Sequence, residues 1–152
     1  MLKLKEKSMR TETKILKTKR GIPSLCKKKS SLGEEVRRPW GNYVVLNVAH
    51  GFKVKLVQVL PYKRLSLQRH KFRSEHWVVV EGKAKVVNGK KTFYLEKNQS
   101  TYIPKGEIHR LENPTDKLLK IIEVQCGEYT EEDDIERLED DFGRDKLNHF
   151  NG

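Results

Sequence analysis

Apolar and polar residues alternate in short runs along most of the chain after Gly33. The clearest run is FKVKLVQVL at residues 52–60, which Pro61 ends. Such alternation places every second side chain on the same face of a strand, as in a sheet that covers a core on one side. Turn residues separate the runs. The strongest turn signal is Asn88-Gly89, because both residues tolerate a positive φ in a hairpin.

The alternating runs predict nine short strands. They cover residues 43–47, 52–60, 65–68, 76–80, 85–87, 92–95, 100–103, 109–112 and 118–125. No helical pattern interrupts them, so the sequence predicts an all-β fold, either an antiparallel sandwich or a jelly-roll barrel. Only residues 130–142 differ. Thr130 is a plausible N-cap and acids crowd the turn after it, which predicts a short C-terminal helix.

The net charge of +11 lies almost entirely in the first thirty residues. They contain eleven Lys or Arg and two acids, whereas residues 31–152 contain 21 basic and 19 acidic residues. We therefore expect a basic, disordered tail over residues 1–32, one domain over residues 33–145 and a second tail over residues 146–152. A nucleic-acid contact through the basic tail is less favoured than a solvated extension, and a targeting segment is a further alternative.

The basic tail has no apolar run long enough for a signal-peptide core or a membrane span. The two cysteines, Cys26 and Cys126, do not form a disulfide framework, and neither belongs to a Cys-x-x-Cys pair. From these features we expect a cytoplasmic protein that does not contact a membrane.

Four polar residues could share one metal ion. Gln68 and His70 are two residues apart and so share a strand face, Glu75 follows a short loop, and His109 follows a tight turn at residues 104–106. Two imidazoles, one carboxylate and one amide oxygen suit a divalent metal of intermediate hardness. Each of these residues alone would more often be structural, but the four together predict a metal site.

The spacings of these residues resemble the two motifs of the cupin superfamily. The first motif reads here as Tyr62, Gln68-Arg-His70, Glu75 and Gly82, and the second as Asn98, Pro104-Lys-Gly106, His109 and Asn113. Gln68 replaces a usual histidine, which disfavours a cupin dioxygenase. Tyr62 and Asn98 stand where glycine is usual. The resemblance implies a cupin jelly-roll barrel.

Residues 35–145 also resemble type II phosphomannose isomerases, which usually form the C-terminal domain of bifunctional mannose-1-phosphate guanylyltransferase/mannose-6-phosphate isomerases. Matching segments include Arg38-Pro-Trp-Gly41, Arg73-x-Glu-His-Trp77 and Ile122-Glu-Val-Gln125. The resemblance implies interconversion of mannose 6-phosphate and fructose 6-phosphate through a cis-enediolate, in GDP-mannose and polysaccharide-precursor metabolism. One Zn, Co, Mn, Ni or Fe ion at the four residues would stabilise the enediolate oxygens. The chain has no Gly-rich nucleotide loop, so we do not expect guanylyltransferase activity.

The implied isomerase reaction needs a proton carrier. Glu123 shares a strand face with Leu119 and Ile121, which predicts an inward carboxylate whose pKa is raised by burial. The resemblance favours His76, although alternation points it outward if Glu75 points inward, and a metal-bound water is a third candidate. The resemblance also adds Arg73 and Asn98 to the predicted catalytic residues.

A sugar phosphate also needs cationic partners, and the planar guanidinium of arginine suits phosphate. The resemblance assigns this role to Arg38, Arg137 and Arg144, and the last two would share one face of the predicted helix. The expected partners are a sugar-phosphate substrate and a second copy of the chain, because cupin barrels commonly dimerise. The alternative is a non-catalytic cupin that binds a sugar or a nucleotide sugar.

Overall fold

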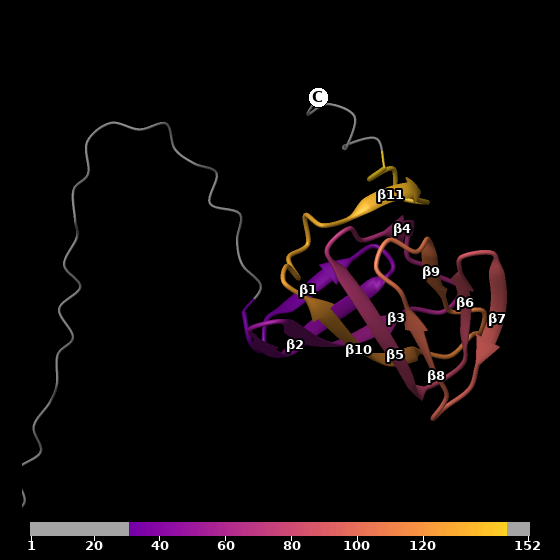
Figure 1. The fold of residues 1–152 in the computed structure, drawn as a ribbon. Helices are drawn as coiled ribbons and strands as arrows, with labels where there is room; N and C mark the ends of the chain where they lie inside the picture. The colour runs from indigo at the N-terminus through magenta and orange to yellow at the C-terminus, as the bar shows by residue number, and fades with distance from the viewer. Residues whose placement is uncertain (1–30, 146–152) are drawn as a thin grey trace, which may run out of the picture.

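The computed structural model describes residues 31–145, so most of the predicted basic tail and the whole predicted C-terminal tail lie outside the described residues. The described part contains eleven strands and no helix (Figure 1). The strands are β1 (Glu35–Arg38), β2 (Gly41–Ala49), β3 (Phe52–Val59), β4 (Leu67–Arg69), β5 (Arg73–Glu81), β6 (Ala84–Asn88), β7 (Lys91–Leu95), β8 (Ser100–Ile103), β9 (His109–Glu112), β10 (Leu119–Gly127) and β11 (Glu136–Glu139).

The strands form two antiparallel sheets. One sheet has the order β1-β2-β3-β10-β5-β8, and the other has the order β11-β4-β9-β6-β7. The all-β prediction is confirmed, and each of the nine predicted strands has a counterpart. Strands β1 and β11 are additional. Strand β1 was missed because its sequence, EVRR, contains a single apolar residue.

Alternation along the strands divides the interior into a polar end and an apolar end. On β3, Lys53 and Lys55 are buried, and the next two inward positions are Val57 and Val59. Residues that pair on neighbouring strands lie side by side, so β10 and β5 also have polar inward residues at one end and apolar ones at the other. Lys55 pairs with Glu123 on β10, which pairs with Trp77 on β5, whereas Val57 pairs with Ile121 and then Val79. The candidate site therefore lies where the inward positions change from apolar to polar.

Two non-glycine residues of the described chain have a positive φ, Tyr62 at 57° and Asn98 at 69°. These are the two positions where the cupin motifs usually have glycine. Asparagine tolerates the left-handed region well, but a tyrosine is rare there. The Tyr62 side chain is 71% exposed, so little packing offsets the cost of its backbone conformation.

The predicted helix over residues 130–142 is wrong. The segment makes turns and then forms β11, which pairs with the short strand β4 (Figure 1). Several of its acids form ion pairs with arginines of the barrel. For example, Glu136 binds Arg69, Glu139 binds Arg110 and Asp141 binds Arg64. These contacts, like the pairing of β11 with β4, join residues far apart in sequence, and a local sequence pattern cannot detect them.

Residues 31–145 include no helix that is long and apolar enough to span a lipid bilayer.

Candidate metal centre and its cavity

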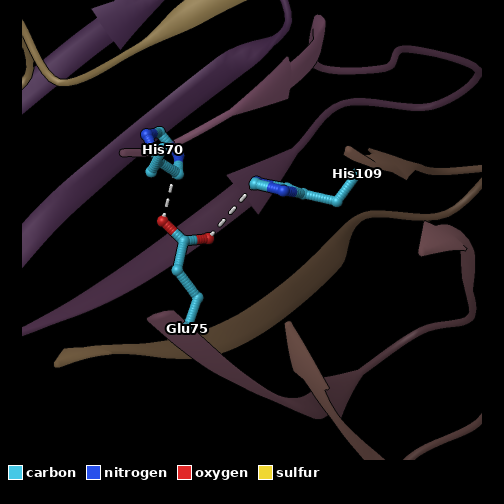
Figure 2. Close-up of side chains that lie close together, drawn as sticks. All are labelled: His70, Glu75 and His109. Atoms are coloured by element: carbon cyan, nitrogen blue, oxygen red, sulfur yellow. Dashed lines mark ion pairs between the residues drawn. The ribbon is translucent and has the colours of Figure 1, made fainter. Parts of the chain in front are cut away.

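Three side chains from different parts of the chain meet inside the barrel: His70 just after β4, Glu75 on β5 and His109 at the start of β9. We call them the ligand cluster (Figure 2). One ligand atom from each lies within 4.8 Å of the others. The Glu75 carboxylate lies between the imidazoles, with Oε1 3.2 Å from His70 Nε2 and Oε2 3.7 Å from His109 Nε2. All three side chains are almost completely buried.

Both imidazoles in the ligand cluster are fixed through Nδ1. His70 Nδ1 donates to the backbone carbonyl of Asp134, and His109 Nδ1 donates to the carbonyl of Glu107 at 2.8 Å. A carbonyl oxygen can only accept, so Nδ1 carries a proton in both rings, and Nε2 is the nitrogen that faces Glu75. His109 Nε2 is buried and has no hydrogen-bond partner. Burial also lowers the pKa of His109, which favours the neutral, ligating form.

The fourth predicted ligand, Gln68, lies beside the ligand cluster. It pairs with His109 across strands β4 and β9, and its Nε2 lies 3.4 Å from His70 Nε2. Its Oε1 accepts a hydrogen bond from Ser66 at 2.7 Å. The oxygen and nitrogen of an amide exchange places by a simple rotation, after which Ser66 could accept from Nε2 and Oε1 would face the histidines.

Glu75 is also held by three further side chains. Arg73 Nε donates to Oε1 at 3.1 Å, Trp77 Nε1 donates to Oε2 at 3.0 Å, and Gln125 Nε2 lies 3.4 Å from Oε1. Burial alone would raise the pKa of Glu75, but contacts with His70, Arg73 and His109 hold it well below its usual range. The carboxylate is therefore ionised and oriented toward the two Nε2 atoms.

A second buried carboxylate, Glu123, lies next to Glu75 on the inner face. It accepts hydrogen bonds from Gln125 Nε2 at 2.7 Å and Trp77 Nε1 at 3.2 Å, and Lys55 Nζ is 4.0 Å away. Burial and the negative charge of Glu75 raise the pKa of Glu123 to about 7, although the positive charges of Lys55 and Arg73 oppose that rise. This carboxylate can hold or release a proton near neutral pH.

A narrow cavity of about 50 Å³ lies beside the ligand cluster, and of the three residues in that cluster only Glu75 lines it. It is lined by Gln68, Arg73, Glu75, Glu123, Arg38, Arg137 and Arg144 among others. The structure thus places seven predicted residues around one space. Arg137 reaches it from β11 and Arg144 from the segment after it, so the two arginines come together without the helix that the sequence suggested.

The three predicted phosphate-binding arginines are close enough to affect one another. Burial and the positive charges of Arg144 and Arg38 lower the pKa of Arg137, and its buried Nε has no hydrogen-bond partner. Arg144 donates to both oxygens of Asp140, at 2.8 and 2.6 Å. A buried guanidinium nitrogen without an acceptor, beside two more arginines, favours an anion at this end of the cavity.

The segment between β10 and β11 covers this cavity. Lys53 Nζ donates to the carbonyl of Thr130 at 2.7 Å, and Lys55 forms an ion pair with Glu132. Glu132 lines the cavity, and the positive charges of Lys55 and Arg73 lower its pKa although burial opposes them. A carboxylate of the chain itself therefore lies among the cations of the cavity.

Two predicted catalytic residues lie away from the cavity. His76 is exposed, with its ring centre 4.7 Å from that of Tyr102 on β8, because its neighbour Glu75 points inward. Asn98 is exposed in the turn between β7 and β8, where its backbone nitrogen donates to the carbonyl of Val79.

Among the strand residues of the site, sequence reasoning missed Lys55, Trp77 and Gln125. Alternation along a strand could have revealed two of them, because side chains two residues apart point to the same face. Trp77 shares the face of Glu75, and Gln125 shares the face of Glu123. Lys55 pairs directly with Glu123 on the neighbouring strand. Lys55 was not singled out because the register between strands is invisible in a single sequence.

A larger open groove lies on the other side of His70. It is lined by Phe72, Tyr129 and Asp134 among others. The His70 edge that contacts Asp134 is Nδ1, whereas Nε2 faces Glu75. The groove therefore meets His70 on its Nδ1 side, whereas the narrow cavity is lined by Glu75 and Glu123 and is the better candidate for chemistry.

The donor set fits a divalent metal ion. Two imidazole nitrogens and an ionised carboxylate converge, and the Gln68 amide can add an oxygen, although His70 Nε2 also lies 3.3 Å from Arg73 Nη2. The unpartnered, buried His109 Nε2 is the most direct sign, since buried polar atoms without a partner are rare. Carbonyl oxygens behind both histidines are the outer contacts that metal-binding imidazoles usually have.

Solved structures confirm the fold. The chain is similar to the capsular polysaccharide assembling protein CapF from Staphylococcus aureus (TM-score 0.62, 19% identity), over 70% of this chain and 32% of that one. It is also similar to a sugar phosphate isomerase of the cupin superfamily from Silicibacter pomeroyi (TM-score 0.52, 21% identity), over 56% and 58%. The fold is a cupin barrel, as predicted, without the C-terminal helix.

Curated relatives are much closer in sequence. The alginate biosynthesis protein AlgA of Pseudomonas aeruginosa is 56% identical over 110 residues, which are 72% of this chain and 23% of AlgA. The xanthan biosynthesis protein XanB of Xanthomonas campestris is 47% identical over 123 residues, 81% of this chain and 26% of XanB. The mannose-1-phosphate guanylyltransferase ManC of Salmonella typhimurium is 47% identical over 110 residues, 72% of this chain and 23% of ManC.

This chain thus spans about a quarter of the length of these relatives. A family model described as "Mannose-6-phosphate isomerase C-terminal" matches residues 26–140, which include every residue of the ligand cluster and also Glu123. The chain belongs to the family of mannose-6-phosphate isomerase C-terminal domains.

Proposed function

We propose that this domain is a metal-dependent aldose-ketose isomerase that interconverts mannose 6-phosphate and fructose 6-phosphate. The observation that carries the proposal is the position of Glu123. It is a buried carboxylate with a pKa of about 7, one strand away from a candidate metal centre and in the same cavity as three arginines. Proton transfer at a carbon next to a carbonyl needs a base of this kind.

In this proposal Glu123 takes the proton from C2 of the open-chain aldose and returns it to C1, while the hydroxyl proton of O2 passes to O1, so that C2 becomes the carbonyl carbon of the ketose. Its pKa near neutrality allows both halves of the transfer. Trp77 and Gln125 orient the carboxylate by donating to its two oxygens. The apolar floor formed by Val57, Ile121 and Val79 helps to exclude water from the reacting carbons.

A divalent ion held by His70, Glu75, His109 and Gln68 would supply Lewis-acid stabilisation of the charge that develops on the substrate oxygens. Arg73 has a related role among the chain's own residues. Its guanidinium is buried beside Glu75, and its Nη1 donates to the carbonyl of Glu131 at 2.9 Å. It places a fixed positive charge next to the site where negative charge accumulates.

Arg38, Arg137 and Arg144 bind the phosphate in this proposal. All three line the cavity, and the unpartnered Nε of Arg137 is available to an anionic oxygen. Binding at these residues holds the sugar by its far end and presents C1 and C2 to Glu123. Phosphate binding of this kind lowers the entropy cost of orienting the reacting carbons.

The cavity must open before a sugar phosphate can enter. Its volume of about 50 Å³ is smaller than the several hundred Å³ typical of ligand pockets. The ion pair between Lys55 and Glu132 is the contact to be broken, because Glu132 is part of the covering segment and its side chain is 36% exposed. In this proposal the substrate anion replaces the Glu132 carboxylate among the cations.

A coupled assay tests the proposal. The purified full chain is freed of metal and loaded separately with Zn, Co, Mn, Ni or Fe, and fructose 6-phosphate formation from mannose 6-phosphate is followed. We expect turnover with at least one metal and loss of turnover in Glu123→Gln. Saturable binding of mannose 6-phosphate with no turnover under any metal would instead support a non-catalytic sugar-binding cupin.

A further inference from the structure

The residue that links the C-terminal segment most closely to the ligand cluster is Asp134. Its carboxylate accepts hydrogen bonds from the backbone nitrogens of Lys71 at 3.0 Å and Phe72 at 2.9 Å, the two residues that follow His70. Its own backbone carbonyl accepts the hydrogen bond from His70 Nδ1. One residue therefore holds both the imidazole and the loop that carries it. Asp134 is 7% exposed, so these contacts are shielded from water.

The turn that contains Asp134 contacts a second residue of the site. The backbone nitrogen of Asp134 donates to the carbonyl of Glu131 at 3.2 Å, which closes the turn. The same Glu131 carbonyl accepts a hydrogen bond from Arg73. The turn thus presents two carbonyl oxygens to the barrel, one to Arg73 and one to His70. The Asp134 carboxylate fixes this turn against the loop between β4 and β5.

We propose that Asp134 is a positioning residue for the metal centre: its carboxylate holds the loop after His70 so that its carbonyl can fix the imidazole tautomer. The inference rests on the proposed metal-dependent function and names a residue that the metal would not touch. A carbonyl that accepts from Nδ1 leaves Nε2 of the neutral ring unprotonated, so that Nε2 could bind a metal ion. Without the carboxylate, the two backbone nitrogens lose their acceptor and the carbonyl loses its fixed distance from His70.

Asp133 provides a matched control. It is the preceding residue, it has the same charge, and it is exposed, and its carboxylate accepts a hydrogen bond from the Tyr129 hydroxyl. Asp133→Asn changes the charge of the segment as Asp134→Asn does, but it leaves both contacts to the His70 loop intact. A difference between the two variants therefore isolates the position of the carboxylate from its charge.

The first measurement is the dissociation constant for Co²⁺ of the full chain, together with the visible absorption spectrum of bound cobalt. We expect Asp134→Ala to weaken binding about 10- to 100-fold, the usual effect of losing an outer contact to a metal ligand. Asp134→Asn should show a smaller loss, because its amide oxygen can serve only one of the two backbone nitrogens. Asp133→Asn should bind Co²⁺ as the wild type does, with the same spectrum.

The second measurement needs no metal. Nitrogen-15 NMR of the imidazoles in the metal-free protein reports which ring nitrogen of His70 carries the proton. We expect a single Nδ1-protonated form in the wild type and in Asp133→Asn, and a mixture of the two tautomers in Asp134→Ala. If Asp134→Ala does not fold, the Co²⁺ affinity and the His70 tautomer are both measured on Asp134→Asn.

Unchanged cobalt affinity and an unchanged His70 tautomer in the Asp134 variants would overturn the positioning role. A wild-type chain that binds no divalent metal would overturn the proposed metal centre instead, and the NMR comparison would still decide the role of Asp134 in fixing His70. The two failures are therefore distinguishable.

Discussion

Glu75 and Glu123 lie on neighbouring strands and share the same two hydrogen-bond donors, Trp77 Nε1 and Gln125 Nε2. Two buried carboxylates so close together repel each other, and the shared donors reduce that repulsion. Their other neighbours differ. Glu75 faces two imidazoles and Arg73 and stays ionised, whereas the pKa of Glu123 rises to about 7. In the proposed function, Glu75 is therefore the metal-binding carboxylate and Glu123 the proton carrier.

This division predicts how the stability of the metal-free protein depends on pH. The pKa of Glu123 is about 7 in the folded chain and 4.5 when unperturbed, so the folded state binds the proton more tightly. Its contribution is fully present below pH 4.5 and is lost as the pH rises through about 7, with a total of up to about 3 kcal/mol. Urea unfolding from pH 5 to pH 8 should show wild-type stability falling relative to Glu123→Gln. A constant difference between the two proteins across this range would contradict the raised pKa.

The phosphate-binding arginines give a second prediction. Arg137→Ala should raise the KM for mannose 6-phosphate about 10- to 100-fold with a smaller effect on kcat, since a charged hydrogen bond contributes about 1.5–3 kcal/mol. Arg37→Ala is the control, because the Arg37 side chain is 88% exposed and points away from the cavity that Arg38 lines. Steady-state kinetics of both variants provide the check. Equal KM values for Arg137→Ala and the wild type would remove Arg137 from the phosphate site.

The sequence placed Arg137 at the phosphate site partly because of a predicted helix that the structure does not contain. Arg137 and Arg144 were expected on one helix face, but Arg137 lies on β11 and Arg144 in the turn after it. They meet because β11 pairs with β4, with Arg137 opposite Gln68. Arg69, Arg110 and Arg64 bind acids of the same segment from the barrel. A single sequence shows the acids but not their partners.

The covering segment gives a third prediction. Glu132→Gln keeps the size of the side chain but removes the charge that pairs with Lys55. If the substrate anion replaces this carboxylate, the KM for mannose 6-phosphate should fall about threefold, as expected for a partly exposed ion pair of about 0.7 kcal/mol. Glu136→Gln, which breaks an exposed pair with Arg69, is the control. An unchanged or raised KM in Glu132→Gln would mean that Glu132 does not compete with the substrate.

The left-handed residue Tyr62 gives a fourth prediction, on stability alone. Glycine has no Cβ to strain at a φ of 57°, so Tyr62→Gly should raise the free energy of unfolding by about 1 kcal/mol after the entropy cost of glycine in the unfolded chain. Asn98→Gly should gain less, because asparagine tolerates this region. Chemical denaturation of the two variants measures the difference. A destabilised Tyr62→Gly would show that the exposed ring makes a stabilising contact.

Much of the ligand set could be predicted because it depends on local spacing. Gln68 and His70 are two residues apart around a strand end, and the parity that pointed Glu75 inward also pointed His76 outward. Asn98 shows the limit of this reasoning. Its place in a motif predicted importance, but its backbone conformation explains why the position is special, and its side chain faces solvent.

The central claim is that His70, Glu75 and His109 share one divalent ion. The most direct test is the metal content of the purified full chain after cobalt loading and gel filtration, compared between the wild type, His70→Ala and His109→Ala. We expect one ion per chain in the wild type and none in either variant, with far-UV circular dichroism unchanged. A wild-type chain without metal, or a His109→Ala variant that keeps a full equivalent, would contradict the account.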